Sequence, residues 1–286
     1  MKSILIPVDF SDCSFTASKY AAEIAKLTKA KLIFFNAYFV PFSGQEIYFS
    51  PEIIAEQEKS VMVKLMNFSN KVVQSVTDSS SLICHHVTMP GLLTNYISDL
   101  IEEHSIDMIV MGTKGASGLS GILLGSNTAE VIEKCSCPVL AVPSETWFKK
   151  PGKIVFATNY ADNDFQTLYL LAEMFKPFNP EIIVLHVEIN GDHKTENRML
   201  EWFKGQVLTN IPYDNFSFQL TKGADVEHTV NNFILENDIE LLSVSNRKRN
   251  FFDKLTSRSL SKKLAYHTNM PLLAFHAHSV SSTPIF

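Results

Sequence analysis

Short hydrophobic runs alternate along the chain with longer stretches in which hydrophobic residues recur every three or four positions. In the first half of the chain the runs occupy residues 3–8, 31–37, 82–88, 107–111 and 138–142. Runs of this length are typical of buried strands, and a period of three to four residues is typical of amphipathic helices. Strands that alternate with helices predict βαβ units, a mostly parallel sheet and right-handed crossovers.

Residues at the ends of these stretches predict where the helices begin and end. Ser11 precedes a stretch whose hydrophobic positions run from Ala17 to Leu27, and its hydroxyl group can cap that helix. Pro51 occupies the first position of a second helix, where a backbone N–H group is not needed. A third hydrophobic stripe extends over residues 92–101, and His104 lies at the end of that helix.

The chain contains an internal duplication. Segments from the start of the first half reappear 150 residues later, and segments from its end reappear 133 residues later. The pairs are 2–9 with 152–159, 35–37 with 185–187, 106–110 with 239–243, and 137–141 with 270–274. We therefore expect two copies of one domain. The second copy is shorter between its second strand and the run that ends at Leu220.

The two copies predict domains at residues 1–145 and 151–280. A linker at 144–150, bounded by Pro143 and Pro151, joins them. A chain of 286 residues suits two domains of about 140 residues each. The predicted fold class is α/β, with two tandem, doubly wound, mostly parallel five-stranded sheets flanked by helices.

Composition narrows the class of ligand. Hydrophobic residues make up 45% of the chain and charged residues 19%, as in an ordinary globular protein. The net charge of -5 gives no general support for nucleic-acid binding. Residues 1–145 contain 10 lysines and no arginine. A phosphate bound by this half must be held by backbone N–H groups and lysines rather than by a guanidinium group.

Neither a membrane-spanning helix nor a disulfide framework is expected. No hydrophobic stretch approaches the roughly 18 residues that span a bilayer, and the first run is too short for the core of a signal peptide. The four cysteines lack the spacing of a disulfide framework or a zinc site. We expect reduced thiols in a cytoplasmic protein, and no shared metal site at residues 84–86.

The segment from Met111 to Glu130 is the most unusual in the chain. Five of the chain's 11 glycines fall within residues 112–125. Glycine permits close backbone approach, so that successive N–H groups can converge on an anion. Residues 125–127 then begin a helix, whose unpaired N–H groups suit a phosphate. The segment lacks the Gly-Lys-Ser/Thr ending of a Walker A loop and the Gly-x-Gly of a dinucleotide-binding loop.

This segment resembles the ATP-binding signature of the universal stress protein family, which reads Gly, two residues, Gly, nine residues and Gly-Ser or Gly-Thr. The matching residues here are Gly112, Gly115, Gly125 and Ser126. Three further segments resemble the family: Pro7-Val8-Asp9, Leu185-His186-Val187 and Cys137-Pro138-Val139. The resemblance spans both copies and implies Rossmann-like domains that pair as an internal pseudo-dimer through residues 137–142 and 270–275.

The resemblance implies a nucleotide site in the first copy. Residues that would flank the adenine and ribose are Pro7, Val8, Asp9, Met111 and Gly112, with Ala37 in place of the usual valine beside the adenine. Residues that would hold the phosphates, bridged by Mg²⁺, are Gly115, Gly125, Ser126 and Asn127. Two alternatives stay open: Asp9 caps the first helix instead, and Lys114 points into water rather than toward a phosphate.

The second copy departs from this signature. In this copy Gly112 is replaced by Ser245, Gly115 by Lys248, Gly125 by Arg258 and Asp9 by Asn159. Ser126 keeps its residue type, in Ser259. Side chains at former glycine positions would occupy the space of the phosphates. The loop at residues 247–263 is strongly basic, and it either binds another anion or a protein partner or forms a solvated face.

These observations predict a stress-response or regulatory protein that binds an adenine nucleotide, ATP or AMP, in its first domain. Two alternatives stay open, a scaffolding or dimerisation protein without nucleotide and a slow ATP hydrolase that uses Asp9. No nucleophile elbow, metal-binding helix pair or carboxylate pair beside the glycines indicates a catalytic site. The sequence leaves open which nucleotide is bound, whether the chain forms a homodimer and which protein partner it meets.

Overall fold

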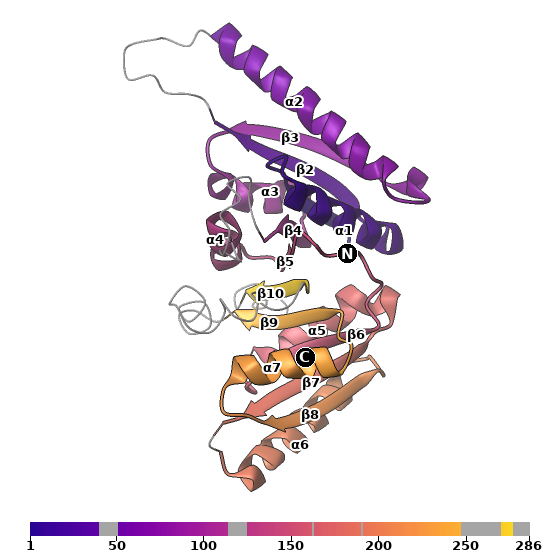
Figure 1. Cartoon of the computed structure of the whole chain (residues 1–286), viewed down its shortest axis with the longest axis vertical. Helices are drawn as coiled ribbons and strands as arrows, with labels where there is room; N and C mark the ends of the chain where they lie inside the picture. Colours follow the sequence, from indigo (N-terminus) through magenta and orange to yellow (C-terminus); the bar gives the residue numbers. More distant parts are fainter. Residues whose placement is uncertain (40–50, 114–124, 162, 190, 247–269, 277–286) are drawn as a thin grey trace, which may run out of the picture. The chain divides into compact units, whose positions relative to one another are not determined.

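The computed structural model describes residues 1–39, 51–113, 125–161, 163–189, 191–246 and 270–276, which form two compact units (Figure 1). The boundary between the units falls between Phe148 and Lys149. Each unit contains its own parallel sheet with helices packed on it. The prediction of an α/β fold with doubly wound, parallel sheets is confirmed.

The first unit alternates strands and helices as the hydrophobic pattern predicts. Its elements are β1 (Ser3–Pro7), α1 (Asp12–Thr28), β2 (Lys31–Tyr38), α2 (Pro51–Gln74), η1 (Ser79–Ser81), β3 (Cys84–Pro90), η2 (Leu93–Asn95), α3 (Ile97–His104), β4 (Met108–Gly112), α4 (Ser126–Lys134) and β5 (Val139–Val142). The strands lie in the order β3-β2-β1-β4-β5, and each pair of neighbours is parallel. The connections therefore diverge between β1 and β4, where open α/β sheets bind their ligands.

Local sequence signals set the helix ends of the first unit. The hydroxyl oxygen of Ser11 accepts a hydrogen bond of 3.1 Å from the backbone N–H of Ser14, so Ser11 caps α1 as predicted. Helix α2 begins at Pro51, also as predicted. The third stripe does not form one helix, because it divides into the 3-10 turn η2 and the helix α3 at Tyr96. Helix α3 ends at His104, as expected.

The second unit repeats this arrangement, with shorter counterparts of α1 and α2. Its elements are β6 (Lys153–Thr158), α5 (Asp164–Phe175), η3 (Lys176–Phe178), β7 (Glu181–Glu188), α6 (His193–Asn210), β8 (Phe216–Lys222), α7 (Val226–Glu236), β9 (Leu241–Asn246) and β10 (Leu272–His276). The strand order is β10-β9-β6-β7-β8, again with parallel neighbours. The predicted shortening falls between β7 and β8, where α6 has 18 residues and α2 of the first unit has 24.

The duplication extends to individual hydrogen bonds. A carboxylate oxygen of Asp107, just before β4, accepts hydrogen bonds from the backbone N–H groups of Lys2 and Ser3 at the start of β1. Glu240 occupies the same place before β9, where it accepts from the N–H groups of Gly152 and Lys153 at 3.1 and 2.7 Å. In both units an acidic side chain therefore ties together the starts of two neighbouring strands.

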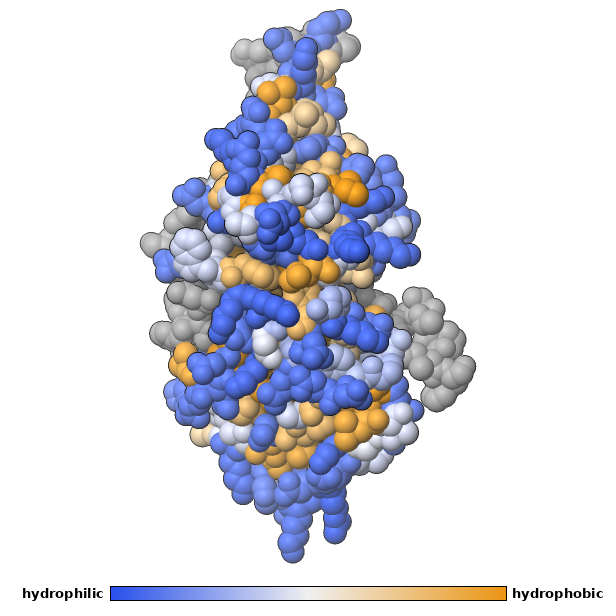
Figure 2. Space-filling view, turned by 90° about the vertical axis from the view of Figure 1, so that its right-hand side faces the viewer, coloured by the Kyte–Doolittle hydropathy of each residue, from blue (hydrophilic) through white to orange (hydrophobic). Residues whose placement is uncertain are grey.

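The outer surface is mixed in character. On the face drawn in Figure 2, hydrophilic residues interleave with small groups of hydrophobic ones. Such scattered apolar side chains are normal on a folded protein. Among the described residues, no helix combines the length and the hydrophobicity needed to cross a lipid bilayer.

Candidate functional site

A cavity of about 410 Å³ lies in the first unit, where β1, β2 and β4 end. Its wall is completed by the turn after β3 and by the first turns of α4. The residues that line it are Pro7, Val8, Asp9, Ser14, Phe35, Asn36, Ala37, Gly91, Leu92, Leu93, Thr94, Met111, Gly112, Gly125, Ser126, Asn127, Thr128 and Glu130. The cavity thus occupies the carboxyl ends of the strands at the point where the connections diverge.

Nine of the ten predicted site residues line this one cavity. They are Pro7, Val8, Asp9, Ala37, Met111, Gly112, Gly125, Ser126 and Asn127. The tenth, Gly115, lies outside the described residues, as does Lys114. Residues separated by more than a hundred positions are therefore neighbours in space, although whether a nucleotide binds between them stays a prediction.

The turn from β1 into α1 is fixed by a short chain of hydrogen bonds. One carboxylate oxygen of Asp9 accepts hydrogen bonds from the backbone N–H of Ser11, at 3.0 Å, and from its hydroxyl group, at 2.6 Å. Ser11 in turn caps α1, so the alternative in which Asp9 is the capping residue is wrong. Asp9 acts one step earlier, because it orients the residue that caps the helix.

The end of β2 is joined to the end of β1 by a buried side chain. The amide nitrogen of Asn36 donates a hydrogen bond of 2.6 Å to the carbonyl oxygen of Val8. The backbone N–H of Val8 donates to the carbonyl oxygen of Phe35 at 2.8 Å. The two strands are therefore still bonded to each other beyond the last pair of the ladder, Pro7 with Phe35. Their bonded ends form this side of the cavity wall.

Gly112 is required by packing, whatever the cavity binds. A Cβ atom at this position would lie 2.6 Å from the sulfur of Cys13 and 3.1 Å from the carbonyl carbon and oxygen of Cys13. Those carbonyl atoms belong to the backbone of α1 and cannot move aside. A glycine of the predicted signature thus lets α1 lie directly against the end of β4.

The two ends of the glycine-rich segment are bonded to each other. The N–H of Gly125 donates to the carbonyl oxygen of Thr113 at 2.6 Å, and the hydroxyl group of Thr128 donates to that of Gly112 at 2.8 Å. Gly125 is the N-cap of α4 and has no capping side chain. Within the described part of the chain, the N–H groups of the first turn of α4 therefore receive no capping side chain at the wall of the cavity, which suits an anion.

Sequence reasoning missed Ser14, Phe35, Asn36 and Thr128, which lie close in sequence to residues it named, and two further parts of the wall. The first is Gly91–Thr94, which follows β3, and the rule that ligands bind at the carboxyl ends of parallel strands would have indicated it. The second is Glu130, which lies four residues after Ser126 and so on the same face of α4. Both were detectable once the predicted strands and helix were placed side by side.

Glu130 and Asp9 are the charged residues of the described lining. The carboxylate of Glu130 lies 2.5 Å from the ammonium nitrogen of Lys134, one turn along α4. This hydrogen bond, the positive charge of Lys134 and a hydrogen bond with Thr94 hold the pKa of Glu130 below its ordinary value. The residue therefore carries its negative charge throughout the neutral pH range.

The second unit has different side chains at the corresponding place. Ser245, the counterpart of Gly112, accepts a hydrogen bond of 3.0 Å from the side-chain amide of Asn163, the counterpart of Cys13. Asp164, the counterpart of Ser14, is buried and accepts a hydrogen bond of 2.7 Å from the hydroxyl group of Thr158. The polar groups at these strand ends bind one another, and a buried carboxylate stands where the first unit has a hydroxyl group.

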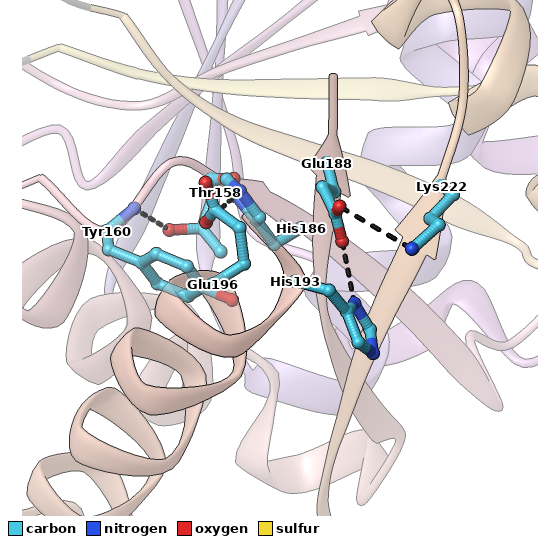
Figure 3. A network of polar contacts seen from close by, with 7 residues as sticks. All are labelled: Thr158, Tyr160, His186, Glu188, His193, Glu196 and Lys222. Carbon is cyan, nitrogen blue, oxygen red and sulfur yellow. Dashed lines mark hydrogen bonds and ion pairs between the residues drawn. The ribbon is translucent and has the colours of Figure 1, made fainter. Parts of the chain in front are cut away.

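A further polar network of the second unit joins β7 to α6 (Figure 3). His186 donates from Nδ1 to the carbonyl oxygen of Thr158 at 2.8 Å, and its Nε2 lies 3.2 Å from a carboxylate oxygen of Glu196 on α6. The ring of Tyr160 stacks on the imidazole of His186, with centroids 4.4 Å apart. Burial and the nearby charge of Glu196 raise the pKa of Tyr160 far above its ordinary value. An aromatic ring thus covers the end of β7.

The same two elements are joined a second time, two residues further along β7. Glu188 is buried, and its carboxylate lies 2.8 Å from Nδ1 of His193 on α6 and 3.7 Å from the ammonium nitrogen of Lys222 on β8 (Figure 3). Each pair takes one histidine and one glutamate from opposite elements. The end of β7 and the start of α6 are therefore joined by two histidine–glutamate contacts.

The described residues offer no alternative chemistry based on metals or disulfides. Among them, no group of three or more histidine, cysteine or acidic residues is placed to hold a metal ion. All four cysteines are free thiols, and Cys13, Cys135 and Cys137 are buried.

Comparison with known proteins supports the resemblance. The model of the universal stress protein family matches residues 1–143. Universal stress protein MJ0531 of Methanocaldococcus jannaschii is 37% identical over 155 residues, which cover 53% of this chain and 84% of that protein. Universal stress protein YxiE of Bacillus subtilis is 26% identical over 148 residues, which cover 49% of this chain and 97% of that protein.

A solved structure resembles the chain over nearly its full length. The crystal structure of a universal stress protein from Archaeoglobus fulgidus covers 96% of this chain and 98% of its own, with a TM-score of 0.70 and 16% identity. At this identity the likeness concerns the fold. It extends to both halves of the chain, whereas the two sequence relatives each cover about half.

Proposed function

Because the chain belongs to the universal stress protein family, we propose that its first unit binds an adenine nucleotide in the cavity where β1, β2 and β4 end. Occupancy by ATP or AMP would change how the chain meets a partner, as in a regulatory or stress-response protein. The observation that carries this proposal is the uncapped N-terminus of α4, which opens on the same cavity as the ends of β1 and β4.

The lining offers groups for each part of a nucleotide. Val8, Ala37 and Met111 present apolar surface that suits a base, and Asp9 presents a carboxylate that can accept hydrogen bonds from ribose hydroxyl groups. The N–H groups and hydroxyl group at Ser126 and its neighbours suit phosphate oxygens. The volume of about 410 Å³ falls within the range of roughly 300–1,000 Å³ that is usual for small-molecule sites.

A divalent cation would be held mainly by the nucleotide. The described residues form no cluster that could hold a metal ion by itself, and one oxygen of Asp9 is engaged by Ser11. Mg²⁺ commonly keeps several waters and binds through phosphate oxygens and one or two carboxylates. The lining therefore fits a Mg²⁺–nucleotide complex, in which the ion would neutralise phosphate charge.

We extend the proposal to an asymmetric chain in which the second unit holds no nucleotide. Ser245 and Asn163 place two polar side chains, hydrogen-bonded to each other, at the positions that Gly112 and Cys13 occupy in the first unit. The buried carboxylate of Asp164 would repel a phosphate at that place. Because these groups bind one another, a structural or scaffolding role is the second candidate for the second unit.

Calorimetric titration of the nucleotide-free full chain with Mg-ATP and with AMP tests the proposal. We expect one site per chain, and ligand at 100 times its dissociation constant should stabilise the first unit by about 2.7 kcal/mol. Two sites per chain would contradict the asymmetry, and the absence of binding by both nucleotides would contradict the proposal itself.

Matched variants locate the site. Asp9→Asn and Gly125→Arg place the residues of the second copy in the first, and both should weaken binding. The control is Asn159→Ala in the second unit, which should leave affinity and stoichiometry unchanged. Release of phosphate that persists in Asp9→Asn protein would come from a contaminant and not from this cavity.

A further inference from the structure

The charges around the cavity oppose the charge of the proposed ligand. The described lining contains two carboxylates, Asp9 and Glu130, and no lysine or arginine. Donors for phosphate come from backbone N–H groups and hydroxyl groups, which carry no net charge. A triphosphate would therefore enter a site whose described side chains are negatively charged.

Glu130 is held at this wall by two partners. Its carboxylate lies 2.5 Å from the ammonium nitrogen of Lys134 and interacts more weakly with Thr94, which also lines the cavity. Lys134 itself does not belong to the lining. Of the two partners, the negatively charged residue is therefore the one that belongs to the cavity wall.

The position of Glu130 on α4 determines which part of a ligand it meets. It follows Ser126 by one helical turn, so its side chain lies on the same face of the helix as the residues at the uncapped N-terminus. Asp9 follows β1, and one of its oxygens accepts two hydrogen bonds from Ser11. Glu130 is therefore the carboxylate of the lining that belongs to the helix whose N-terminus would hold the phosphates.

We infer that Glu130 is a specificity-determining residue, which selects against negative charge on the ligand at the N-terminus of α4. The inference rests on the proposed function. A nucleoside monophosphate, or a triphosphate complexed with a divalent cation, is favoured over the free triphosphate. The N–H groups of α4 attract a phosphate, and Glu130 limits how much charge that phosphate can carry.

The expected effect is moderate because Glu130 is partly exposed and solvent screens its charge. With the screening of bulk water, a charge roughly 8 Å from the ligand changes affinity by about two- to threefold per ligand charge. Free ATP carries about two more negative charges than AMP. Removal of the charge at position 130 should therefore favour ATP over AMP by about fivefold, and 0.5 M salt should suppress most of this difference.

The test compares Glu130→Gln with Glu133→Gln in the nucleotide-free full chain. Both changes remove one negative charge from α4, but Glu133 is exposed and does not line the cavity. Dissociation constants for AMP and ATP are measured by calorimetry at low ionic strength, first with EDTA and then with excess Mg²⁺. Glutamine keeps the shape of the side chain and its capacity to bond with Thr94.

In EDTA we expect Glu130→Gln to tighten ATP binding about fivefold more than AMP binding. Glu133→Gln should change both equally, and Mg²⁺ should shrink the effect of Glu130→Gln on ATP. An unchanged ratio of ATP to AMP affinity in Glu130→Gln, or the same change in Glu133→Gln, would overturn the inference while AMP binding still supports the proposed function. If the wild-type chain binds neither nucleotide, the proposed function fails first.

Discussion

The side-chain amide of Asn36 donates a hydrogen bond of 2.6 Å to the carbonyl oxygen of Val8, across the ends of β2 and β1. In the second unit His186, 150 residues later, makes the same connection from its Nδ1 to Thr158 at 2.8 Å. Two different side chains thus satisfy one geometric requirement. In the first unit the bond lies just beyond the last pair of the ladder, and in the second unit it lies at the last pair.

Asn36→Ala should destabilise the first unit and weaken nucleotide binding. The change leaves the carbonyl group of Val8 without its partner in a buried place, which costs about 1–3 kcal/mol. Asn36→His is the matched variant, because it supplies the donor that the second unit uses. Thermal unfolding should show a lower midpoint for Asn36→Ala and a smaller change for Asn36→His. If both variants lowered the unfolding midpoint equally, the size of the side chain at position 36, and not its hydrogen bond, would determine the stability.

Gly112→Ala should destabilise the first unit even without ligand. The new Cβ atom would lie 2.6 Å from the sulfur of Cys13 and 3.1 Å from its carbonyl group, and such overpacking typically costs about 1–3 kcal/mol. Cys13→Ala in the same chain should recover part of the loss, because it removes the sulfur and leaves the backbone contact. Urea unfolding of the single and double variants measures this coupling, and strictly additive effects would contradict the contact.

Asp107→Ala and Glu240→Ala should each destabilise their own unit. Each change removes the acceptor for two backbone N–H groups at the start of a strand. We expect losses of about 1–2 kcal/mol in each case. Hydrogen exchange followed by mass spectrometry should show faster exchange in residues 2–7 for the first variant and in residues 152–158 for the second. Faster exchange in both units from one change would argue against independent roles.

His86 should make the first unit less stable as the pH falls. Burial, and then the neighbouring His85, lower the pKa of His86 from its ordinary value, and its Nε2 lies 2.6 Å from the hydroxyl oxygen of Ser69. The unfolded chain therefore binds a proton more readily than the folded one. Stability is complete above the ordinary pKa of about 6.5 and is lost as the pH falls through that value toward the lowered one.

Thermal unfolding between pH 7.5 and 5.5 measures this dependence. His86→Gln should flatten the slope that His86 contributes to the first unit, since glutamine does not titrate and can still bond with Ser69. His85→Gln removes the smaller of the two causes of the lowered pKa and should therefore flatten the slope less than His86→Gln. An unchanged slope in His86→Gln would contradict this account.

Ser14→Asp should exclude nucleotide from the first unit. The change places a carboxylate in the lining, as Asp164 does at the corresponding place in the second unit. We expect affinity for ATP to fall at least about tenfold at low ionic strength, because a negative charge then faces the phosphates. Ser14→Ala is the control and should bind more tightly than Ser14→Asp. Equal affinities in these two variants would show that position 14 does not face the phosphates.

The hydrophobic pattern was sufficient to predict the fold of each unit. Runs such as 3–8 and 31–37 became β1 and β2 because a strand buried on both faces needs consecutive apolar residues, and that requirement is local. Ser11 and Pro51 marked helix starts because capping depends on adjacent residues alone. The break of the third stripe at Tyr96 was not predicted, since its hydrophobic period continues through the 3-10 turn.

The residues of the candidate site that belong to a sequence motif could be predicted. The other lining residues could be identified only from the tertiary structure. The sequence by itself determined that the glycines and the start of α4 form one motif, and the family resemblance implied that Asp9 belongs to the same site. Only the folded chain brought Gly91–Thr94, Asn36 and Glu130 to the same cavity, because they come from different strands and helices. The structure also decided that Gly112 serves the packing of α1 on β4, since a contact between elements about a hundred residues apart has no local signature.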